Sequence, residues 1–285
     1  MAQCRCFLAS DLHGRLDRYR ALFAAVRSEV PDLVLLAGDL LPHRWSTSMG
    51  GEGFVSEILV AGLTGVRDAL GDRSPRVMLI LGNDDERAAE STMLDGERDG
   101  RWEYLHRRVA EVGEYRVAGY SFVPPTPFLL KDWERYDVSR YVDPGCVSPE
   151  EGYRTTRIDV DTVRSSTIAD DLDALVAAGD AVNTVLLAHS PPYRTALDRA
   201  DLDGRSYDHV PLDVHVGSIA IRRFIEERQP LLTLHGHIHE SARLTGRWRD
   251  RIGRTHCFSA AHDGPELALV RFDLEDLDGA TRELI

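Results

Sequence analysis

Carboxylate, amide and imidazole side chains recur along the chain at points where a short apolar run has just ended. Oxygen and nitrogen donors of this kind bind divalent metals such as Mn, Fe or Zn, and the pattern contains no thiolate. The segment Gly236-His237-Ile238-His239 is the most specific, because two histidines separated by one residue on an extended segment point the same way and suit a metal pair. The candidate metal ligands are Asp11, His13, Asp39, Asn83, His189, His237 and His239.

The other segments, taken singly, have ordinary explanations. Asp11-Leu12-His13 and Gly38-Asp39 resemble common turns. Gly82-Asn83 is compatible with a turn before a helix, and His189 with a hydrogen-bonded histidine at a strand end. A common site is therefore favoured by the order and placement of these segments together, and not by any of them alone.

The elements that must position these side chains are buried strands, which the sequence predicts at 4–9, 33–37, 76–81, 184–188 and 231–234. Apolar residues three and four apart predict helices over 15–30 and 54–70, with Pro31 ending the first. This alternation is typical of a layered α/β fold. In open α/β sheets, ligands bind just beyond the carboxyl ends of the strands, which is where the candidate ligands lie.

The rest of the chain is predicted with less detail. Residues 100–160 form a loop-rich excursion whose aromatic side chains, including Trp133, either line a substrate pocket or pack as a cover over the core. Helices follow at 166–178 and 219–228, the second capped by Ser218, and strands at 256–260 and 267–272. Because no repeat or linker interrupts the chain, residues 1–285 are expected to form a single domain.

The formal net charge of −13, with no compensating basic cluster, disfavours extended DNA or RNA as a partner. A small anionic substrate remains compatible, because bound metals invert the local field. No apolar stretch is long enough for a membrane helix, and the N-terminus lacks a signal peptide, so a cytoplasmic protein is expected. Cys4 and Cys6 fit a buried first strand better than a zinc site.

In order and spacing, the segments together resemble the calcineurin-like metallophosphoesterase superfamily, and most closely its compact prokaryotic phosphodiesterase-type members. That pattern runs D-x-H, G-D, G-N-H-D/E, a histidine, then G-H-x-H. The match extends over residues 11–239. The resemblance implies an α/β fold in which two mixed β-sheets pack as a sandwich flanked by helices.

The resemblance also implies a binuclear metal centre. Asp39 would bridge the two ions, which are Mn, Fe or Zn. Two such ions neutralise the oxygens of a phosphate ester and activate a water for hydrolysis. One ion would be held by Asp11, His13, Asp39 and His239, and the other by Asp39, Asn83, His189 and His237.

The chain departs from the family pattern at Asp84, which stands where relatives have a histidine near the leaving group. An ionised aspartate there would hinder departure, and a protonated one could act as an acid only if its pKa were well above ~4. We therefore expect activated phosphodiesters to be better substrates than esters with poor leaving groups. His215, just before a helix start that could receive a phosphate, and His235 are alternative proton sources.

The resemblance favours an enzyme, a metal-dependent phosphoesterase acting on a small phosphate ester. Two other classes stay open. A non-catalytic protein-interaction scaffold of the same fold would agree with Asp84 but leaves the full ligand set unexplained. A nuclease would agree with the ligand set but conflicts with the charge of −13.

Overall fold

The computed structural model describes residues 4–43, 50–176 and 181–285, and within them the strands form two mixed sheets and a small hairpin. The first sheet has the order β14 (Asp276–Leu284), β13 (Ala268–Asp273), β1 (Arg5–Ala9), β2 (Leu33–Ala37), β3 (Arg76–Ile80) and β4 (Glu103–Tyr104). The second has the order β11 (Arg249–Ile252), β12 (Thr255–Ser259), β10 (Leu232–His235), β7 (Thr184–Ala188), β6 (Tyr115–Tyr120) and β5 (Arg108–Val112). The hairpin pairs β8 (Ser206–Tyr207) with β9 (Val210–Pro211).

Residues alternate along each central strand between two hydrophobic cores. In β2, Leu33 and Leu35 pack into a core shared by both sheets, whereas Val34 and Leu36 pack into the core under the helices. In β7, Val185 belongs to the shared core, which joins the two sheets face to face. Both faces of these strands are therefore buried, which explains why they appear in the sequence as continuous apolar runs.

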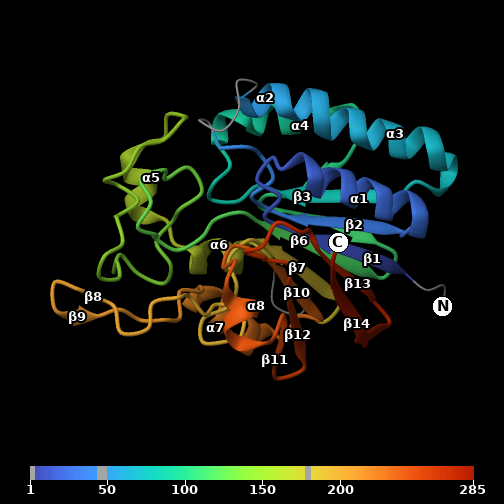
Figure 1. The fold of residues 1–285 in the computed structure, drawn as a ribbon. Coiled ribbons are helices and arrows are strands. Elements are labelled where there is room, and N and C mark those ends of the chain that lie inside the picture. Colours follow the sequence, from blue (N-terminus) through green and yellow to red (C-terminus); the bar gives the residue numbers. More distant parts are fainter. Residues whose placement is uncertain (1–3, 44–49, 177–180) are drawn as a thin grey trace.

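Helices cover the outer faces of the sandwich (Figure 1). On the side of the first sheet lie α1 (Leu16–Glu29), α2 (Gly50–Phe54), a π-helical segment (Val55–Val60), α3 (Ala61–Leu70) and α4 (Glu90–Arg98). On the side of the second sheet, α6 (Ile168–Leu175) packs against α7 (Ile219–Arg228). The short helices α5 (Val160–Ser165) and α8 (Ser241–Thr245) lie in the connections.

The predicted fold class, two mixed sheets flanked by helices, is confirmed. The strand predicted at 33–37 is β2, and the helix predicted at 219–228 is α7, with the Ser218 hydroxyl accepting from the Ile221 amide at 3.0 Å. The helix predicted at 54–70 is interrupted by the π-helical turns. The last residues of the helix predicted at 166–178 lie outside the described residues.

The excursion at 100–160 is held together by buried polar contacts. Lys131 and Glu134 are both fully buried and lie 2.5 Å apart, nitrogen to oxygen. Trp133 and Tyr136 are also buried, so the alternative of a packed cover is the correct one for both of them. Tyr141, by contrast, is 68% exposed.

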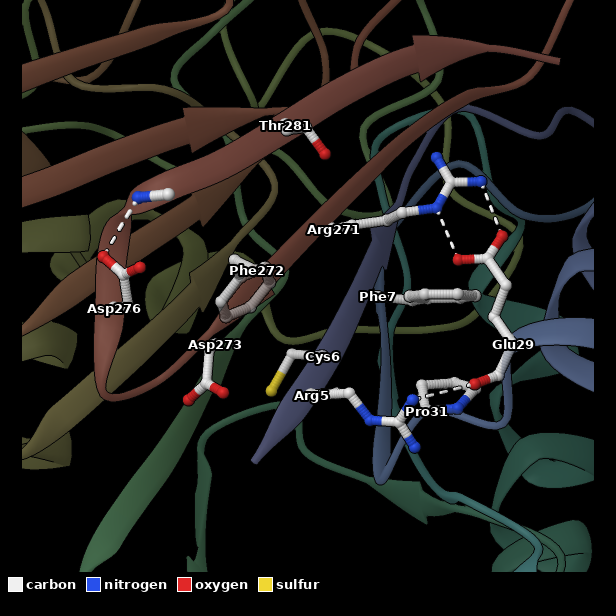
Figure 2. Close-up of a pocket in the computed structure, with 11 residues that line it drawn as sticks. Arg5, Cys6, Phe7, Glu29, Pro31, Arg271, Phe272, Asp273, Asp276 and Thr281 are labelled. Carbon is white, nitrogen blue, oxygen red and sulfur yellow. Dashed lines mark hydrogen bonds and ion pairs between the residues drawn. The ribbon is translucent and has the colours of Figure 1, made fainter. Parts of the chain in front are cut away.

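A cavity of about 280 Å³ opens at the end of the sandwich where β1 begins, the opposite end of that strand from Asp11 (Figure 2). Two of its charged groups are paired with each other, since the Arg271 guanidinium donates to both oxygens of Glu29 at 2.7 Å and also lies 3.0 Å from Glu283. The carboxylates of Asp273 and Asp276 also line it, and Asp273 Oδ2 is buried without a hydrogen bond. Among the described residues, no helix is both long and apolar enough to cross a membrane.

Candidate metal centre

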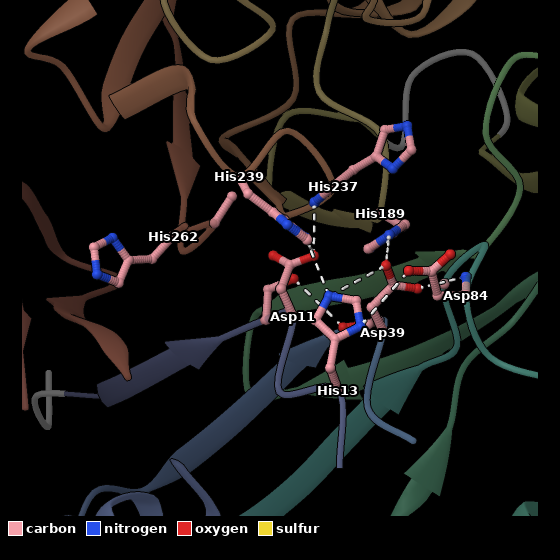
Figure 3. Close-up of polar contacts among 12 residues, drawn as sticks. Asp11, His13, Asp39, Asp84, His189, His237, His239 and His262 are labelled. Carbon is pink, nitrogen blue, oxygen red and sulfur yellow. Dashed lines mark hydrogen bonds and ion pairs between the residues drawn. The ribbon is translucent and has the colours of Figure 1, made fainter. Parts of the chain in front are cut away.

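The candidate ligands follow strands of both sheets and converge at the end of the sandwich where these strands terminate. Asp11, Asp39 and Asn83 come after β1, β2 and β3 of the first sheet. His189 comes after β7 of the second sheet, and His237 and His239 come after β10. Figure 3 shows Asp11, His13, Asp39, His189 and His239 gathered where these strand ends meet.

Main-chain hydrogen bonds extend the ladder of the first sheet past the strand ends. The amide of Asp11 donates to the carbonyl of Gly38 at 3.0 Å, and that of His13 to the carbonyl of Asp39 at 2.8 Å. The backbone is left-handed at Asp11, His13, Asp39 and His237, with φ of 55°, 48°, 52° and 75°. Such conformations are unfavourable for residues other than glycine and persist where surrounding contacts hold them, often at functional sites.

Two glycines leave room for the ligands that pack against them. A Cβ at Gly82 would lie 2.6 Å from His189 Nε2 and closer still to Asp39 Oδ1. A Cβ at Gly236 would lie 2.7 Å from Asp11 Oδ2. Real Cβ atoms do not approach other atoms this closely. Glycine is therefore the residue that fits at positions 82 and 236 without displacing these side chains.

One group of ligand atoms is compact enough to surround a single ion. Donor atoms of Asp11, His13, Asp39 and His239 all lie within 4.8 Å of one another. His239 Nε2 is 3.2 Å from Asp11 Oδ1 and 3.1 Å from His13 Nε2. The amide of His237 donates to the same Asp11 oxygen at 3.0 Å, which fixes the carboxylate.

His189 and His237 are not part of this compact group, although His189 also contacts Asp39. His189 Nε2 is 3.2 Å from Asp39 Oδ2, and the rings of His189 and His237 are 5.1 Å apart. His189 Nδ1 lies 2.6 Å from the main-chain carbonyl of Ala37, to which it donates. That hydrogen bond fixes the tautomer and turns Nε2 toward Asp39, which is the arrangement expected of a metal-ligating histidine.

The buried acids and imidazoles shift one another's pKa values. Burial alone would raise the pKa of Asp39, but the adjacent His189 holds it well below its ordinary range. Burial would lower the pKa of His189, but Asp39 raises it to about 10. In the same way Asp11 outweighs burial and raises the pKa of His239 to about 9. His237, where burial dominates, has its pKa lowered to about 3.

Several metal-donor atoms at this end of the sandwich make no hydrogen bond, although His189 Nε2 lies 3.2 Å from Asp39 Oδ2. Asp11 Oδ2, His13 Nδ1, Asn83 Oδ1 and His189 Nε2 are buried and make no hydrogen bond. Unsatisfied polar atoms are rare in protein interiors because each one forfeits its hydration. Four of them in one cluster of carboxylate, amide and imidazole groups fit the coordination of divalent metal ions.

The carboxylate of Asp84 faces neighbouring protein groups. Its Oδ1 accepts a hydrogen bond from the Asn83 side-chain amide at 3.2 Å, and its Oδ2 is 3.7 Å from His13 Nδ1. Its main-chain amide donates to Asp39 Oδ1 at 2.8 Å. Burial and then the charge of Asp39 raise the pKa of Asp84 to about 7.

The two histidines predicted as alternative proton sources are engaged elsewhere. His235 is fully buried, with Nδ1 3.0 Å from the Ala188 carbonyl and Nε2 2.8 Å from the Thr233 hydroxyl, so neither ring nitrogen is available to a substrate. Burial lowers its pKa to about 4. We therefore withdraw His235. His215 Nδ1 is 2.8 Å from the buried carboxylate of Asp198.

The start of α7 does not form the predicted phosphate receptor. The carboxylate of Asp137 accepts from the amides of Ile219 at 2.6 Å and Ala220 at 3.2 Å, and from the Ser218 hydroxyl at 2.6 Å. A protein carboxylate therefore occupies the place that an anionic ligand would take at this helix terminus.

Sequence reasoning missed the residues that hold the ligand loops in place. Buried Asp85 accepts from the amides of Leu41 at 2.7 Å and Gly82 at 2.9 Å, which ties the loops after β2 and β3 together. Buried Arg18 donates to the carbonyls of Asp11 and Gly264. The position of Asp85 two residues after Asn83 was the available signal for its role. Nothing in the sequence indicates the role of Arg18.

The sequence also gives no sign that His43 lies beside the candidate ligands. It follows the loop after β2, and its ring stacks on His13 with centroids 5.6 Å apart. Its Nε2 lies 3.4 Å from Asp84 Oδ2.

Comparison with known proteins places this geometry in a family. The family model for calcineurin-like phosphoesterase matches residues 5–241. The structure of TT1561 from Thermus thermophilus aligns over 99% of both chains, with a TM-score of 0.59 and 16% identity, which shows a shared fold. An uncharacterized protein of Methanocaldococcus jannaschii, MJ1162, is 41% identical over 75 residues, which are 26% of this chain and 28% of that protein. The chain belongs to the calcineurin-like phosphoesterase family.

Proposed function

We propose that the protein hydrolyses phosphodiesters with two divalent metal ions held at the carboxyl ends of the central strands. The observation that carries the proposal is the cluster of buried donor atoms that make no hydrogen bond, at Asp11, His13, Asn83 and His189. Family membership supports metal-dependent phosphoesterase chemistry in general. The number of ions, their positions and the preference for diesters are part of the proposal.

The ligand assignment divides the candidates into two sets that share Asp39. One ion would take the compact group of Asp11, His13, Asp39 and His239. The other would take Asn83, His189 and His237, with Asp39 shared between the two. When bound, such ions neutralise phosphoryl oxygens and lower the pKa of a water that attacks phosphorus. The donors are oxygen and imidazole nitrogen, which suits Mn, Fe or Zn.

The protein's own groups orient these donors. The Ala37 carbonyl fixes the His189 ring, and the His237 amide fixes the Asp11 carboxylate. Asp84 accepts from the Asn83 amide nitrogen, so the Asn83 oxygen is left to face an ion. The carboxylate of Asp84 also favours a diester, which carries one negative charge, over a monoester, which carries about two near neutral pH.

A comparison of two esters tests the proposal. We expect the manganese-loaded protein to cleave bis-p-nitrophenyl phosphate faster than p-nitrophenyl phosphate. Asp39→Asn should lower cleavage by about 100-fold or more, because it removes the shared carboxylate. Asp17→Asn, which changes an exposed carboxylate in α1, is the matched control and should retain full activity.

Two other results of this experiment would point to the two alternative functions, a binding scaffold and a nuclease. Two bound metals with no cleavage of either ester would overturn the proposal in favour of a binding scaffold. Cleavage of single-stranded DNA that tolerates moderate salt, with no cleavage of the small diester, would favour a nuclease.

Metal affinity should rise with pH. In the metal-free protein the pKa of His189 is about 10 and that of His239 about 9, so both rings carry a proton near neutrality that a metal must displace. Raising the pH from 6.5 to 8.5 removes part of this competition and should strengthen binding. Isothermal titration in two buffers of different ionisation enthalpy measures the protons released. An affinity independent of pH would contradict the assignment of these two rings as ligands.

A further inference from the structure

An imidazole outside the ligand set lies against the metal centre. The ring of His43 is nearly parallel to that of His13, with an interplanar angle of 14° and centroids 5.6 Å apart. Its side chain is 57% exposed, whereas that of His13 is 13% exposed. His43 is therefore on the solvent side of a candidate ligand, where a substrate must approach.

Asp84 connects His43 to the rest of the site. Its Oδ2 lies 3.4 Å from His43 Nε2 and 3.7 Å from His13 Nδ1, so one carboxylate oxygen faces both rings. Its Oδ1 is engaged by the Asn83 amide. Contact with a fixed carboxylate restricts the orientation of an otherwise exposed ring.

The other histidines outside the ligand set are placed differently. His235 has both ring nitrogens engaged in the core. His215 pairs with Asp198 in the loop before α7. His262 pairs with Glu266 at 3.1 Å, and Figure 3 shows its ring apart from the cluster and directed away from it. The stacking of its ring on His13 thus sets His43 apart from these three.

We infer that His43 is a catalytic residue that contacts the departing oxygen of the diester, with Asp84 as its positioning residue. The inference rests on the proposed function. As water oxygen bonds to phosphorus, the bond from phosphorus to the leaving oxygen breaks and its electron pair stays on that oxygen. The proton given up by the attacking water passes to solvent. A hydrogen bond from the His43 ring stabilises the charge that develops on the leaving oxygen.

Diesters with leaving groups of increasing basicity test this role. We expect His43→Gln to lower kcat/KM by about 100-fold for phenyl or alkyl leaving groups. The loss for p-nitrophenolate should be much smaller, because that anion needs less stabilisation. His262→Gln is the matched control: it alters an imidazole that also pairs with a carboxylate, and it should leave the dependence on the leaving group unchanged. Both variants should bind as much metal as the unaltered protein.

A second readout does not depend on turnover. In zinc-loaded protein with ¹⁵N-labelled histidine, orthovanadate should shift the ring resonances of His43, assigned with His43→Gln, but not those of His262. Equal losses for all leaving groups in His43→Gln, or unshifted His43 resonances, would overturn the inference. Absence of diester cleavage by the unaltered protein would instead refute the proposed function, and the resonance shift would still decide whether His43 contacts the anion.

Discussion

Gly82→Ala should abolish tight metal binding and, with it, hydrolysis. The added methyl group would lie 2.6 Å from both His189 Nε2 and the Asp39 main-chain nitrogen, and closer to Asp39 Oδ1. Neither side chain can move aside without losing its place, because His189 is held by the Ala37 carbonyl and Asp39 by the Asp84 amide. A displacement of about 1 Å at a catalytic centre can reduce activity by about 100-fold.

The effect must be separated from general destabilisation. Overpacking a buried site costs about 1–3 kcal/mol, so thermal unfolding should accompany the measurement of metal content. Gly65→Ala, in α3, is the matched control, because a Cβ there meets no atom within 4 Å. It should be neutral or stabilising by up to about 1 kcal/mol. A folded Gly82→Ala protein with normal metal content and turnover would show that the close approach has no functional importance.

Removing the metals should markedly lower the thermal stability. The proposed ligands come from both sheets, so ions bound there would bind only when the two sheets are in register. A ligand present at about 1,000 times its Kd stabilises the folded state by about 4 kcal/mol. For a chain of this size the midpoint of unfolding should fall by roughly 5–15 °C on chelation.

Differential scanning calorimetry with and without EDTA measures this shift, and added Mn should reverse it. Asp39→Asn should respond far less to EDTA than the unaltered protein, whereas Asp17→Asn should respond fully. Equal melting temperatures with saturating Mn and with EDTA would contradict the idea that metal bridges the sheets.

The sequence was most informative where strands are buried on both faces. β2 and β7 are continuously buried, so their ends, and the candidate ligands Asp39 and His189 after them, could be located from the sequence. The order of the segments then fixed the resemblance, and with it the two-sheet fold. Ser218 was recognisable as a cap because its hydroxyl is followed by an apolar helical face.

The remaining elements lack such a signal. β14 carries Asp276, Asp278, Arg282 and Glu283 at an exposed sheet edge, so its polarity hides the strand. The excursion is stabilised by ion pairs such as that of Lys131 with buried Glu134, and spacing along the chain cannot reveal which charges are buried together.

His43 was unpredictable for a related reason. It follows no apolar strand directly, and only the turn of the chain after β2 brings it onto His13. His235 is the opposite case. Its position just before the Gly-His segment suggested a role as a proton source, but its ring is buried in the core. Proximity in sequence to a candidate ligand therefore does not reveal which way a side chain points.

The contact between His189 and the carbonyl of Ala37 has a consequence for how this protein can change over evolutionary time. The acceptor belongs to the main chain, so no side-chain replacement at position 37 that preserves the strand can remove it. The Asp11 carboxylate and the loop beside it are likewise held by amides and carbonyls of other segments. Much of the support around the ligands is thus robust to mutation, and homologous sequences can diverge there while the ligands keep their orientation.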